Sequence, residues 1–280
     1  MAITGRTGIL AVVGHPIDGA RAPAALGSFV AQLGIDLAVV PADVDAAALP
    51  AFLEGARAWQ NLAGLLITMP HKIAIAGLVD ELTVRASTSG AVNLVRRDRD
   101  GTLCGDQVDG AGFVRSLIDA EVDVTGVAVV LFGAGGVGRS IAFALAEAGV
   151  ARIVVVNRSA ARAVALTDDL RHAHPEVEIQ IGIETDAAAA DLLVNATSLG
   201  SDRQPGIPLD PAYIRRGSVV ADVIAAPQTT QLLHEAARRG ARIHPGVRMQ
   251  QAQFQTILAF VGAETDRPEG GRIADAGRGR

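Results

Sequence analysis

The fold is decided by Val129-Val130-Leu131-Phe132-Gly133-Ala134-Gly135-Gly136-Val137-Gly138, where an apolar strand runs into a Gly-x-Gly-x-x-Gly turn. A helical pattern over residues 139–148 follows directly. In such a turn the first glycine permits the tight bend, the second lets backbone N–H groups approach a pyrophosphate, and the third lets the helix pack close to the strand. The helix N-terminus adds oriented donors and a partial positive charge. We therefore expect residues 133–138 to bind a dinucleotide.

A second strand-like run, Arg152–Val156, indicates which dinucleotide binds. It ends at Asn157-Arg158-Ser159, where an NAD-specific site usually carries an acidic residue for the ribose 2′-hydroxyl. Here asparagine stands in that place, and Arg158 and Arg162 follow. Two guanidinium groups suit a 2′-phosphate, so the pattern predicts NADP. The alternative is that both arginines belong to an ordinary solvated loop and helix face.

Composition limits the class of protein. The 280 residues are 49% hydrophobic, which is enough for substantial cores, and the formal net charge is −5. Because nucleic-acid surfaces need clustered positive charge, the scattered arginines argue against such a partner. The single cysteine, Cys104, excludes an internal disulfide framework and a cysteine-rich metal site, so we expect no metal and a reducing cytoplasm.

No apolar run reaches the roughly 20 residues of a membrane span, so we expect no membrane partner. Residues 9–13 are apolar but stop at Gly14, and the hydrophobic core of a signal peptide is missing. Residues 264–280 contain few apolar side chains, and we expect a flexible tail without function. A cytoplasmic location follows as an expectation, and a monomer and a homodimer both stay open.

Strand-like and helix-like patterns alternate along the chain, which predicts an α/β protein with mostly parallel sheets covered by helices. We expect a substrate-binding and catalytic domain over 1–109, a Rossmann-type NADP-binding domain over 110–242, and a helix within 243–263 that packs back on the first domain. A turn at 98–101 predicts a β-hairpin. The expected strands are 8–13, 36–40, 64–68, 91–95, 178–183, 192–195 and 219–223, and the expected helices are 22–33, 46–58, 78–87, 110–120 and 249–261.

The cleft between two such domains is the natural place for a substrate. Polar residues follow apolar runs or adjoin turns at 68–72, 89–93 and 105–110, and these segments contain Lys72 and Asp109. In a partly desolvated cleft a carboxylate could hold an ammonium in place while the lysine exchanges a proton with a substrate oxygen. Taken singly, a lysine after a proline turn is usually a surface residue, and an aspartate before glycine is usually a turn or a helix cap.

These stretches resemble motifs of the shikimate/quinate dehydrogenase family, and the resemblance extends to about residue 262. The similar motifs are Gly14-His15-Pro16-Ile17 for Gly-x-Pro-Ile, Thr68-Met69-Pro70-His71-Lys72 for Thr-Val-Pro-x-Lys, Gly90-Ala91-Val92-Asn93 for Gly-Ala-Val-Asn, and Gly105-Asp106-Gln107-Val108-Asp109-Gly110 for Gly-Asp-Asn-Thr-Asp-Gly.

The resemblance implies an NADP-dependent oxidoreductase that interconverts a cyclic secondary alcohol and its ketone, with Lys72 and Asp109 as the acid/base pair. It also implies that Thr68 and Asn93 hydrogen-bond the hydroxyls of a cyclic polyol or ketone substrate. The cofactor-contacting residues that it implies beyond 133–138 are Asn157, Arg158, Ser159, Arg162, Asn195, Ala196, Thr197, Ser198, Val223, Gly246 and Met249.

The C-terminal helix resembles the family's Gly-x-x-Met segment if Gly246 and Met249 are aligned with it. Gln253 would then be the family's substrate glutamine, and Met249 would lie beside the nicotinamide. Gln250 and Gln251 are competing candidates for the substrate contact.

The departures from the family pattern fall on substrate recognition. The two serines of the family's Ser-x-Ser-Pro sequence, which grips the substrate carboxylate, are Ala20 and Ala22 here. Leu66, Val108 and Ala225 likewise stand where the family has an asparagine, a threonine and a tyrosine. Each lost charge-assisted hydrogen bond would cost about 1.5–3 kcal/mol.

Two interpretations follow. Either Arg21, His15 or His71 binds the carboxylate instead, with Arg21 as a bidentate clamp, or the substrate lacks a carboxylate. The two histidines are otherwise most simply turn residues exposed to solvent. We favour a family member with an altered substrate preference.

Two other classes stay open. The chain could be a non-catalytic NADP-binding regulatory or partner module, although it retains both Lys72 and Asp109, which such a module does not need. It could also be another NADP-linked dehydrogenase that acts on a folate or an amino acid. The order of residues 68–72, Asn93 and Asp109 argues against that alternative.

Overall fold

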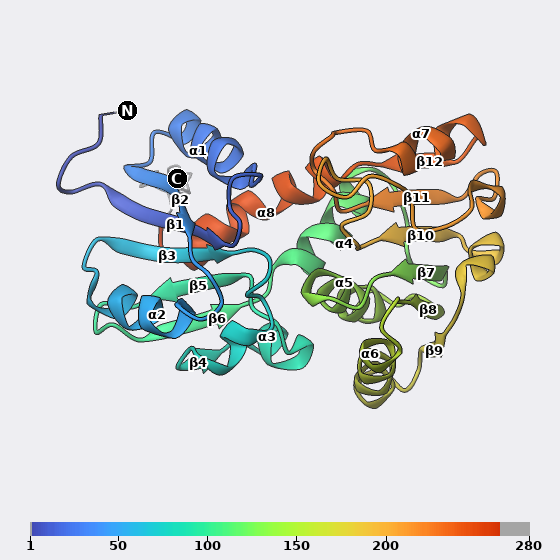
Figure 1. Cartoon of the computed structure of the whole chain (residues 1–280), viewed down its shortest axis with the longest axis horizontal. Helices are drawn as coiled ribbons and strands as arrows, with labels where there is room; N and C mark the ends of the chain where they lie inside the picture. The colour runs from blue at the N-terminus through green and yellow to red at the C-terminus, as the bar shows by residue number, and fades with distance from the viewer. Residues whose placement is uncertain (1, 264–280) are drawn as a thin grey trace, which may run out of the picture.

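The computed structural model describes residues 2–263, so the tail expected over 264–280 lies outside the described residues. The chain forms two α/β halves side by side, each around its own six-stranded sheet (Figure 1). Helices α4 (Asp109–Asp119) and α8 (Gly246–Phe260) connect the halves. The expected two-domain α/β architecture is confirmed. Within 2–263, no helix combines the length and apolar character that a bilayer crossing requires.

The N-terminal sheet is mostly parallel in its first part and antiparallel in its second. Strand β1 pairs in parallel with β2 and β3, whereas β5 is antiparallel to β3 and β6, which confirms the expected hairpin. Helix α2 (Leu49–Ala58) covers one face, and α1 (Ala22–Leu33) covers the other together with α8. The strand order is β2 (Leu37–Asp43), β1 (Gly8–Gly14), β3 (Leu62–Ile67), β5 (Leu94–Arg97), β6 (Leu103–Asp106) and β4 (Glu81–Leu82).

The C-terminal sheet is wholly parallel and doubly wound. Its central strand β7 carries the apolar run that precedes the glycine turn. Helices α4, α5 (Gly136–Glu147) and α6 (Ala160–Ala173) pack on one face, and α7 (Gln231–Arg238) packs on the other with the 3-10 segments η2 (Glu184–Ala189) and η3 (Pro211–Tyr213). The strand order is β12 (Arg242–His244), β11 (Val219–Asp222), β10 (Leu192–Asn195), β7 (Ala128–Phe132), β8 (Arg152–Val156) and β9 (Glu178–Ile181).

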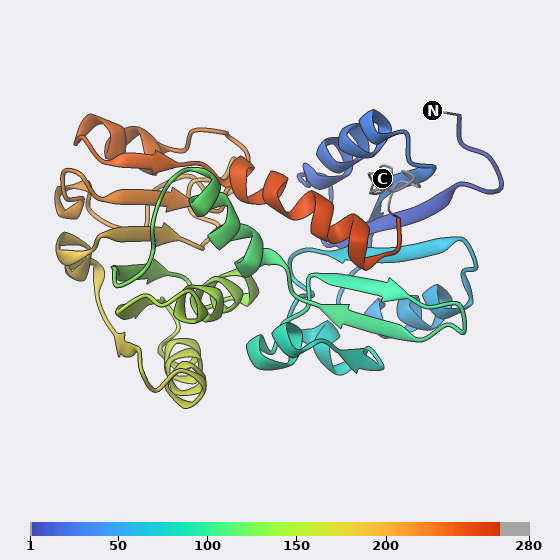
Figure 2. The same cartoon turned by 180° about the vertical axis from the view of Figure 1, so that it is seen from behind.

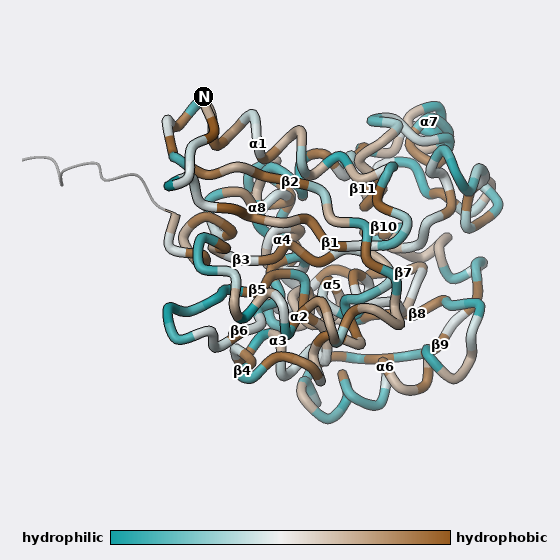
Figure 3. The backbone as a smooth tube through the Cα atoms, turned by 60° about the vertical axis from the view of Figure 1, so that its left-hand side comes forward, coloured by the Kyte–Doolittle hydropathy of each residue, from teal (hydrophilic) through white to brown (hydrophobic). Residues whose placement is uncertain are grey.

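The pattern of hydrophobic residues explains this layering. Strands that are buried on both faces need nearly continuous apolar sequence, and β1 is hydrophobic along its length (Figure 3). The outer helix α6 alternates between hydrophobic and hydrophilic residues in the same view, because only one of its faces meets the sheet.

Helix α8 crosses from the C-terminal half to the N-terminal half, as seen from behind in Figure 2. Met249, near its start, belongs to the core of the C-terminal half. Phe254, further along, packs with Leu10 and Val12 of β1, and its ring centroid lies 5.3 Å from that of Phe29. The expected return of the C-terminal helix to the first domain is confirmed.

The helix expected over residues 78–87 is wrong. The chain instead forms the 3-10 segment η1 (Ala74–Gly77), strand β4 and the short helix α3 (Val84–Ser89). Thr83 caps α3 by accepting a hydrogen bond from the N–H of Ala86. The N–H groups of Asp80 and Thr83 donate to carbonyls of Leu103 and Gly105, so this stretch pairs with the sheet rather than coiling.

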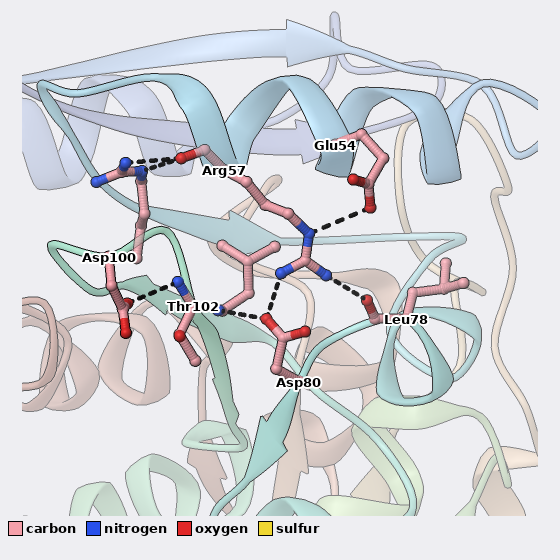
Figure 4. A network of polar contacts seen from close by, with 8 residues as sticks. Glu54, Arg57, Leu78, Asp80, Asp100 and Thr102 are labelled. Carbon is pink, nitrogen blue, oxygen red and sulfur yellow. Dashed lines mark hydrogen bonds and ion pairs between the residues drawn. The ribbon is translucent and has the colours of Figure 1, made fainter.

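A polar network anchors the same region to α2 (Figure 4). The guanidinium of Arg57 pairs with Asp80 and with Glu54, and the N–H of Leu103 donates to the Asp80 carboxylate at 2.8 Å. The hydrogen bond from Arg57 is the main reason that the pKa of Asp80 is lowered. In the turn of the hairpin, the N–H of Thr102 donates to Asp100.

Strand β12 was not expected. Residues 242–244 pair in parallel with β11 and form an edge of the second sheet, and α8 begins at Gly246 rather than at Met249. Three residues are too few for a periodic signal, so only the pairing with β11 reveals this strand.

Candidate active site

Lys72 and Asp109 form an ion pair between the two halves. The Nζ atom of Lys72 lies 2.5 Å from Oδ2 of Asp109, and the two side chains are 14% and 7% exposed. Lys72 follows β3, and Asp109 is the first residue of α4. The structure therefore brings together, in a largely desolvated place, the two residues that the sequence singles out.

Backbone contacts fix the position of Lys72. Its carbonyl accepts a hydrogen bond from the N–H of Val92 at 2.7 Å, and the N–H of Thr68 donates to the carbonyl of Val13. A β-carbon on Gly136 would lie only 2.9 Å from the Lys72 β-carbon. The glycine turn of the second half thus packs directly on the lysine.

Asp109 is held by the start of its own helix. Its N–H donates to Oε1 of the buried Gln107 at 2.9 Å, a contact that the sequence did not indicate. A carboxylate in the first turn also interacts favourably with the helix dipole. Asp106 lies three residues before Asp109. Burial alone would raise the pKa of Asp106, but hydrogen bonds from Arg85 and Thr83 outweigh that effect, and the pKa is lowered.

The predicted substrate residues Thr68, Asn93 and Gln253 keep polar atoms free. Asn93 is buried, and its side-chain carbonyl accepts from the N–H of Val108, which leaves its amide NH2 without a partner among residues 2–263. Within the same described range, no hydrogen bond engages the hydroxyl of Thr68 or the side chain of Gln253. These three side chains therefore have donors and acceptors to offer to a hydroxylated ligand.

Of the three candidate glutamines, only Gln253 is on the buried face of α8. It packs against Gly112 of α4, where a β-carbon would collide with it. Gln250 is half-buried and Gln251 is exposed, and Gln251 lines an outer groove beside Arg115.

The glycine turn fits a pyrophosphate. Gly133 has φ +107°, and a β-carbon there would lie 2.8 Å from the carbonyl oxygen of Ala196. A β-carbon on Gly138 would collide with the carbonyl of Gly133. At Gly135, in contrast, a β-carbon would meet no atom within 4 Å, so the space above the turn is open. No side chain caps the N-terminus of α5, which leaves its first N–H groups available to phosphate oxygens.

The polar residues that follow β8 differ in their contacts. Arg158 and Arg162 are exposed and form no ion pair within residues 2–263, so both are free to meet a 2′-phosphate. Asn157 instead supports the turn, since it accepts from the N–H of Ala134 at 3.0 Å and donates to the carbonyl of Ser159.

Several side chains in residues 195–198 likewise hydrogen-bond to other parts of the protein. The side chain of Asn195 donates to the carbonyl of Leu199 and accepts from the Thr197 hydroxyl at 2.6 Å. It also donates to Asp222, whose pKa is raised by burial. The Ser198 hydroxyl pairs with Gln204.

The start of α8 fits closely against the end of β11. A β-carbon on Gly246 would lie 2.6 Å from the backbone of Val223, and the N–H of Val223 donates to the carbonyl of Asn195. Met249 is 5% exposed, so most of its side chain lies in the core rather than in the cleft.

The expectation of an exposed His71 is wrong. This residue is 1% exposed, and its Nε2 lies 2.7 Å from the carbonyl oxygen of Val44. Burial against a main-chain acceptor removes His71 as a partner for a substrate carboxylate. His15 is half-exposed and bonds Asp43, and Arg21 is exposed at the N-cap of α1.

A doubly wound dinucleotide-binding sheet, a second α/β domain and a Lys–Asp pair between them define a two-domain nicotinamide-dependent oxidoreductase. Residues 12–95 match the family described as shikimate dehydrogenase substrate binding domain, and residues 116–202 match shikimate / quinate 5-dehydrogenase. The chain belongs to the shikimate dehydrogenase family and is an NADP-dependent oxidoreductase of that type.

Similar proteins cover nearly the whole chain. The shikimate dehydrogenase (NADP(+)) of Rubrobacter xylanophilus is 34% identical over 278 residues, which are 98% of this chain and 95% of that protein. Shikimate 5-dehydrogenase from Thermus thermophilus, in complex with NADP(H) and shikimate, superposes with a TM-score of 0.81 at 31% identity over 91% of this chain and 93% of that one. The ligand-free 5-ketofructose reductase of a Gluconobacter strain gives a TM-score of 0.81 at 30% identity over 94% and 95%.

Proposed function

We propose that this oxidoreductase reduces, reversibly and with NADPH, a polyhydroxylated cyclic ketone that carries no carboxylate. The observation behind the proposal is the pair Ala20 and Ala22, which offers no hydroxyl where the family motif has two serines, while Lys72 and Asp109 remain in contact.

The loop between β1 and α1, which contains Ala20 and leads into Ala22, begins against the catalytic segment. The N–H of His15 donates to the carbonyl of Met69 at 3.1 Å, and a β-carbon on Gly14 would collide with the side chain of Thr68. A substrate that contacts Thr68 therefore lies beside this loop. Loss of two charge-assisted hydrogen bonds at about 1.5–3 kcal/mol each would weaken carboxylate binding by several powers of ten.

The solved structures support both substrate types. The Thermus enzyme binds shikimate, which has a carboxylate, and the Gluconobacter enzyme is named for a keto-sugar, which has none. Both superpose equally well, so the overall fold does not select between them. The alanines at positions 20 and 22 favour the uncharged class.

In the proposed reaction, Lys72 moves the proton. Its ammonium donates a proton to the ketone oxygen during reduction, and its neutral amine takes a proton from the hydroxyl during oxidation, while the Asp109 carboxylate holds the side chain in place. Bound NADPH supplies the hydride. Thr68, Asn93 and Gln253 orient the ring through its hydroxyls, which makes the transfer effectively unimolecular.

In this proposal the cofactor binds to residues 133–138, Arg158 and Arg162. It also contacts residues 195–198 and Gly246. The proposal divides the chain as expected, with substrate binding in 1–109, NADP binding in 110–242 and the returning helix in 243–263. A small-molecule partner, a cytoplasmic location and a monomeric or homodimeric state belong to the same proposal.

Absorbance at 340 nm tests the function directly. Purified protein is mixed with NADPH and matched ketones with and without a carboxylate, such as 3-dehydroshikimate and a keto-inositol, and the alcohols are tested with NADP+. We expect turnover with the uncharged compounds. The Lys72→Ala variant should lose turnover and still bind NADPH, as measured by nicotinamide fluorescence. Turnover of shikimate at about 1–1000 per second by the unmodified protein would overturn the substrate assignment.

A further inference from the structure

Arg139, in the first turn of α5, reaches from the cofactor half to the substrate half. Its Nε donates to the carbonyl oxygen of Ser89 at 2.8 Å, and its Nη2 lies 2.7 Å from Oδ2 of Asp169 on α6. The guanidinium carbon lies 5.9 Å from the ring centroid of Phe143. The arginine side chain is only 14% exposed, so these contacts hold it in one orientation.

Ser89 is the last residue of α3. The segment after it contacts Arg139, supports Lys72 and carries Asn93. Gly90 turns the chain with φ +61°, and a β-carbon there would lie 3.6 Å from the Arg139 guanidinium. Two residues later the N–H of Val92 donates to the carbonyl of Lys72. The next residue is Asn93. A shift of Ser89 would therefore move the main chain that supports the lysine and carries the asparagine.

Arg139 also belongs to the turn that faces the pyrophosphate. Its N–H donates to the carbonyl of Gly135, the N-cap of α5, at 2.8 Å. The same helical turn presents Gly136 to the lysine. One residue thus joins the phosphate-binding turn to the segment that supports Lys72 and Asn93.

We propose that Arg139 is a positioning residue that sets the position of the bound cofactor relative to Lys72 and Asn93. Hydride transfer needs the two reacting carbons at near contact distance, and a displacement of about 1 Å can slow it about 100-fold. The guanidinium fork donates in two fixed directions, and a lysine ammonium lacks that geometry. The proposal rests on Lys72 and Asn93 being site residues, but not on which ketone is reduced.

Three variants separate positioning from mere packing. Arg139→Ala removes the link to Ser89, Arg139→Lys keeps the charge without the fork, and Asp169→Ala removes the partner of Arg139 on α6 while leaving the Ser89 contact. We expect kcat/KM to fall about 100-fold in Arg139→Ala and about 10-fold in Arg139→Lys, and to stay within about 3-fold in Asp169→Ala. The dissociation constant for NADPH, measured by fluorescence, should change by less than about 3-fold in all three, because the phosphate-binding N–H groups remain.

Amide hydrogen exchange provides a readout without turnover. In cofactor-free protein, Arg139→Ala should speed the exchange of the Val92 amide, while amides in β7 keep their protection and Asp169→Ala behaves like the parent protein. Unchanged Val92 protection, or a loss of activity no larger than that of Asp169→Ala, would overturn the proposal. So would a lowered Tm with normal kcat. If Lys72→Ala keeps its turnover, the site assignment itself fails, whereas the exchange experiment still reports on Arg139.

Discussion

The N–H of Gly110 donates to the side-chain hydroxyl of Ser140 at 2.7 Å, so the residue after Asp109 touches the helix that follows the glycine turn. A β-carbon on Gly110 would collide with the backbone carbonyl of Ser140. The neighbouring atom is main chain in a buried helix, and it cannot move aside cheaply. The absence of a side chain at residue 110 therefore sets how closely the start of α4, which carries Asp109, approaches α5.

We predict that Gly110→Ala separates α4 from α5 and moves Asp109 relative to the cofactor turn. Activity should fall at least 100-fold, because reacting groups displaced by about 1 Å lose about that factor. Steady-state kinetics and thermal unfolding measure the two effects. Gly55→Ala is the control, since a β-carbon there would meet no atom within 4 Å in the middle of α2, and its stability should be unchanged or slightly higher. Normal activity of Gly110→Ala would refute the spacing argument.

Cofactor preference should depend on Arg158 and Arg162. A hydrogen bond to a charged group contributes about 1.5–3 kcal/mol, so Arg158→Ala should raise the dissociation constant for NADPH about 10- to 100-fold. Binding of NADH should change by less than about 2-fold, because it has no 2′-phosphate. Fluorescence titration with both cofactors measures the ratio, with Arg238→Ala on α7 as the control. An equal loss for NADPH and NADH would show that Arg158 does not select the phosphate.

The cofactor turn could be predicted from sequence because its determinants are local. The three glycines, the apolar strand before them and the helix after them lie within one short stretch, and each glycine answers one steric demand. Lys72 and Asp109 are far apart in sequence, and their contact could be expected only from the motifs that contain them.

Other features depend on contacts that leave no pattern in the sequence. His71 is buried with its ring donating to the carbonyl of Val44 after β2, and residues 80–83 are extended because they pair with β6. Arg139 bonds a main-chain carbonyl, which any residue at position 89 would offer. Such non-local contacts override helical periodicity and turn statistics.

Stability should fall in mild acid because of His244. Burial is the main reason that its pKa is lowered to about 4, and the charges of Arg248 and Arg242 add to the effect. The folded protein therefore keeps this imidazole neutral, with a ring nitrogen 2.8 Å from the hydroxyl of Ser116. In the unfolded chain the same imidazole takes up a proton below its usual pKa of 6.5. The stability that the neutral His244 contributes is complete above pH 6.5. As the pH falls towards 4, the free energy of unfolding decreases by up to about 3 kcal/mol.

Urea unfolding at pH 7 and pH 4.5 measures this loss. In His244→Gln the residue no longer titrates, so its free energy of unfolding should decrease less between the two pH values than that of the parent protein. Carboxylates such as Asp106, whose pKa is lowered, contribute equally to both proteins and cancel in the difference. Parallel pH dependence in the two proteins would mean that His244 is not the titrating group.

Restoring the missing hydroxyls should restore recognition of a carboxylate. In Ala20→Ser/Ala22→Ser two hydroxyls stand at the positions where the family's motif has serines, and each can donate to an anionic oxygen. One such bond contributes about 1.5–3 kcal/mol, so kcat/KM for shikimate should rise about 10- to 100-fold, mainly through a lower KM. Activity with the uncharged ketone should change little, and Ala24→Ser on the exposed side of α1 should change neither substrate. If the double variant folds normally and shikimate remains as poor a substrate as before, Ala20 and Ala22 are not what excludes the carboxylate.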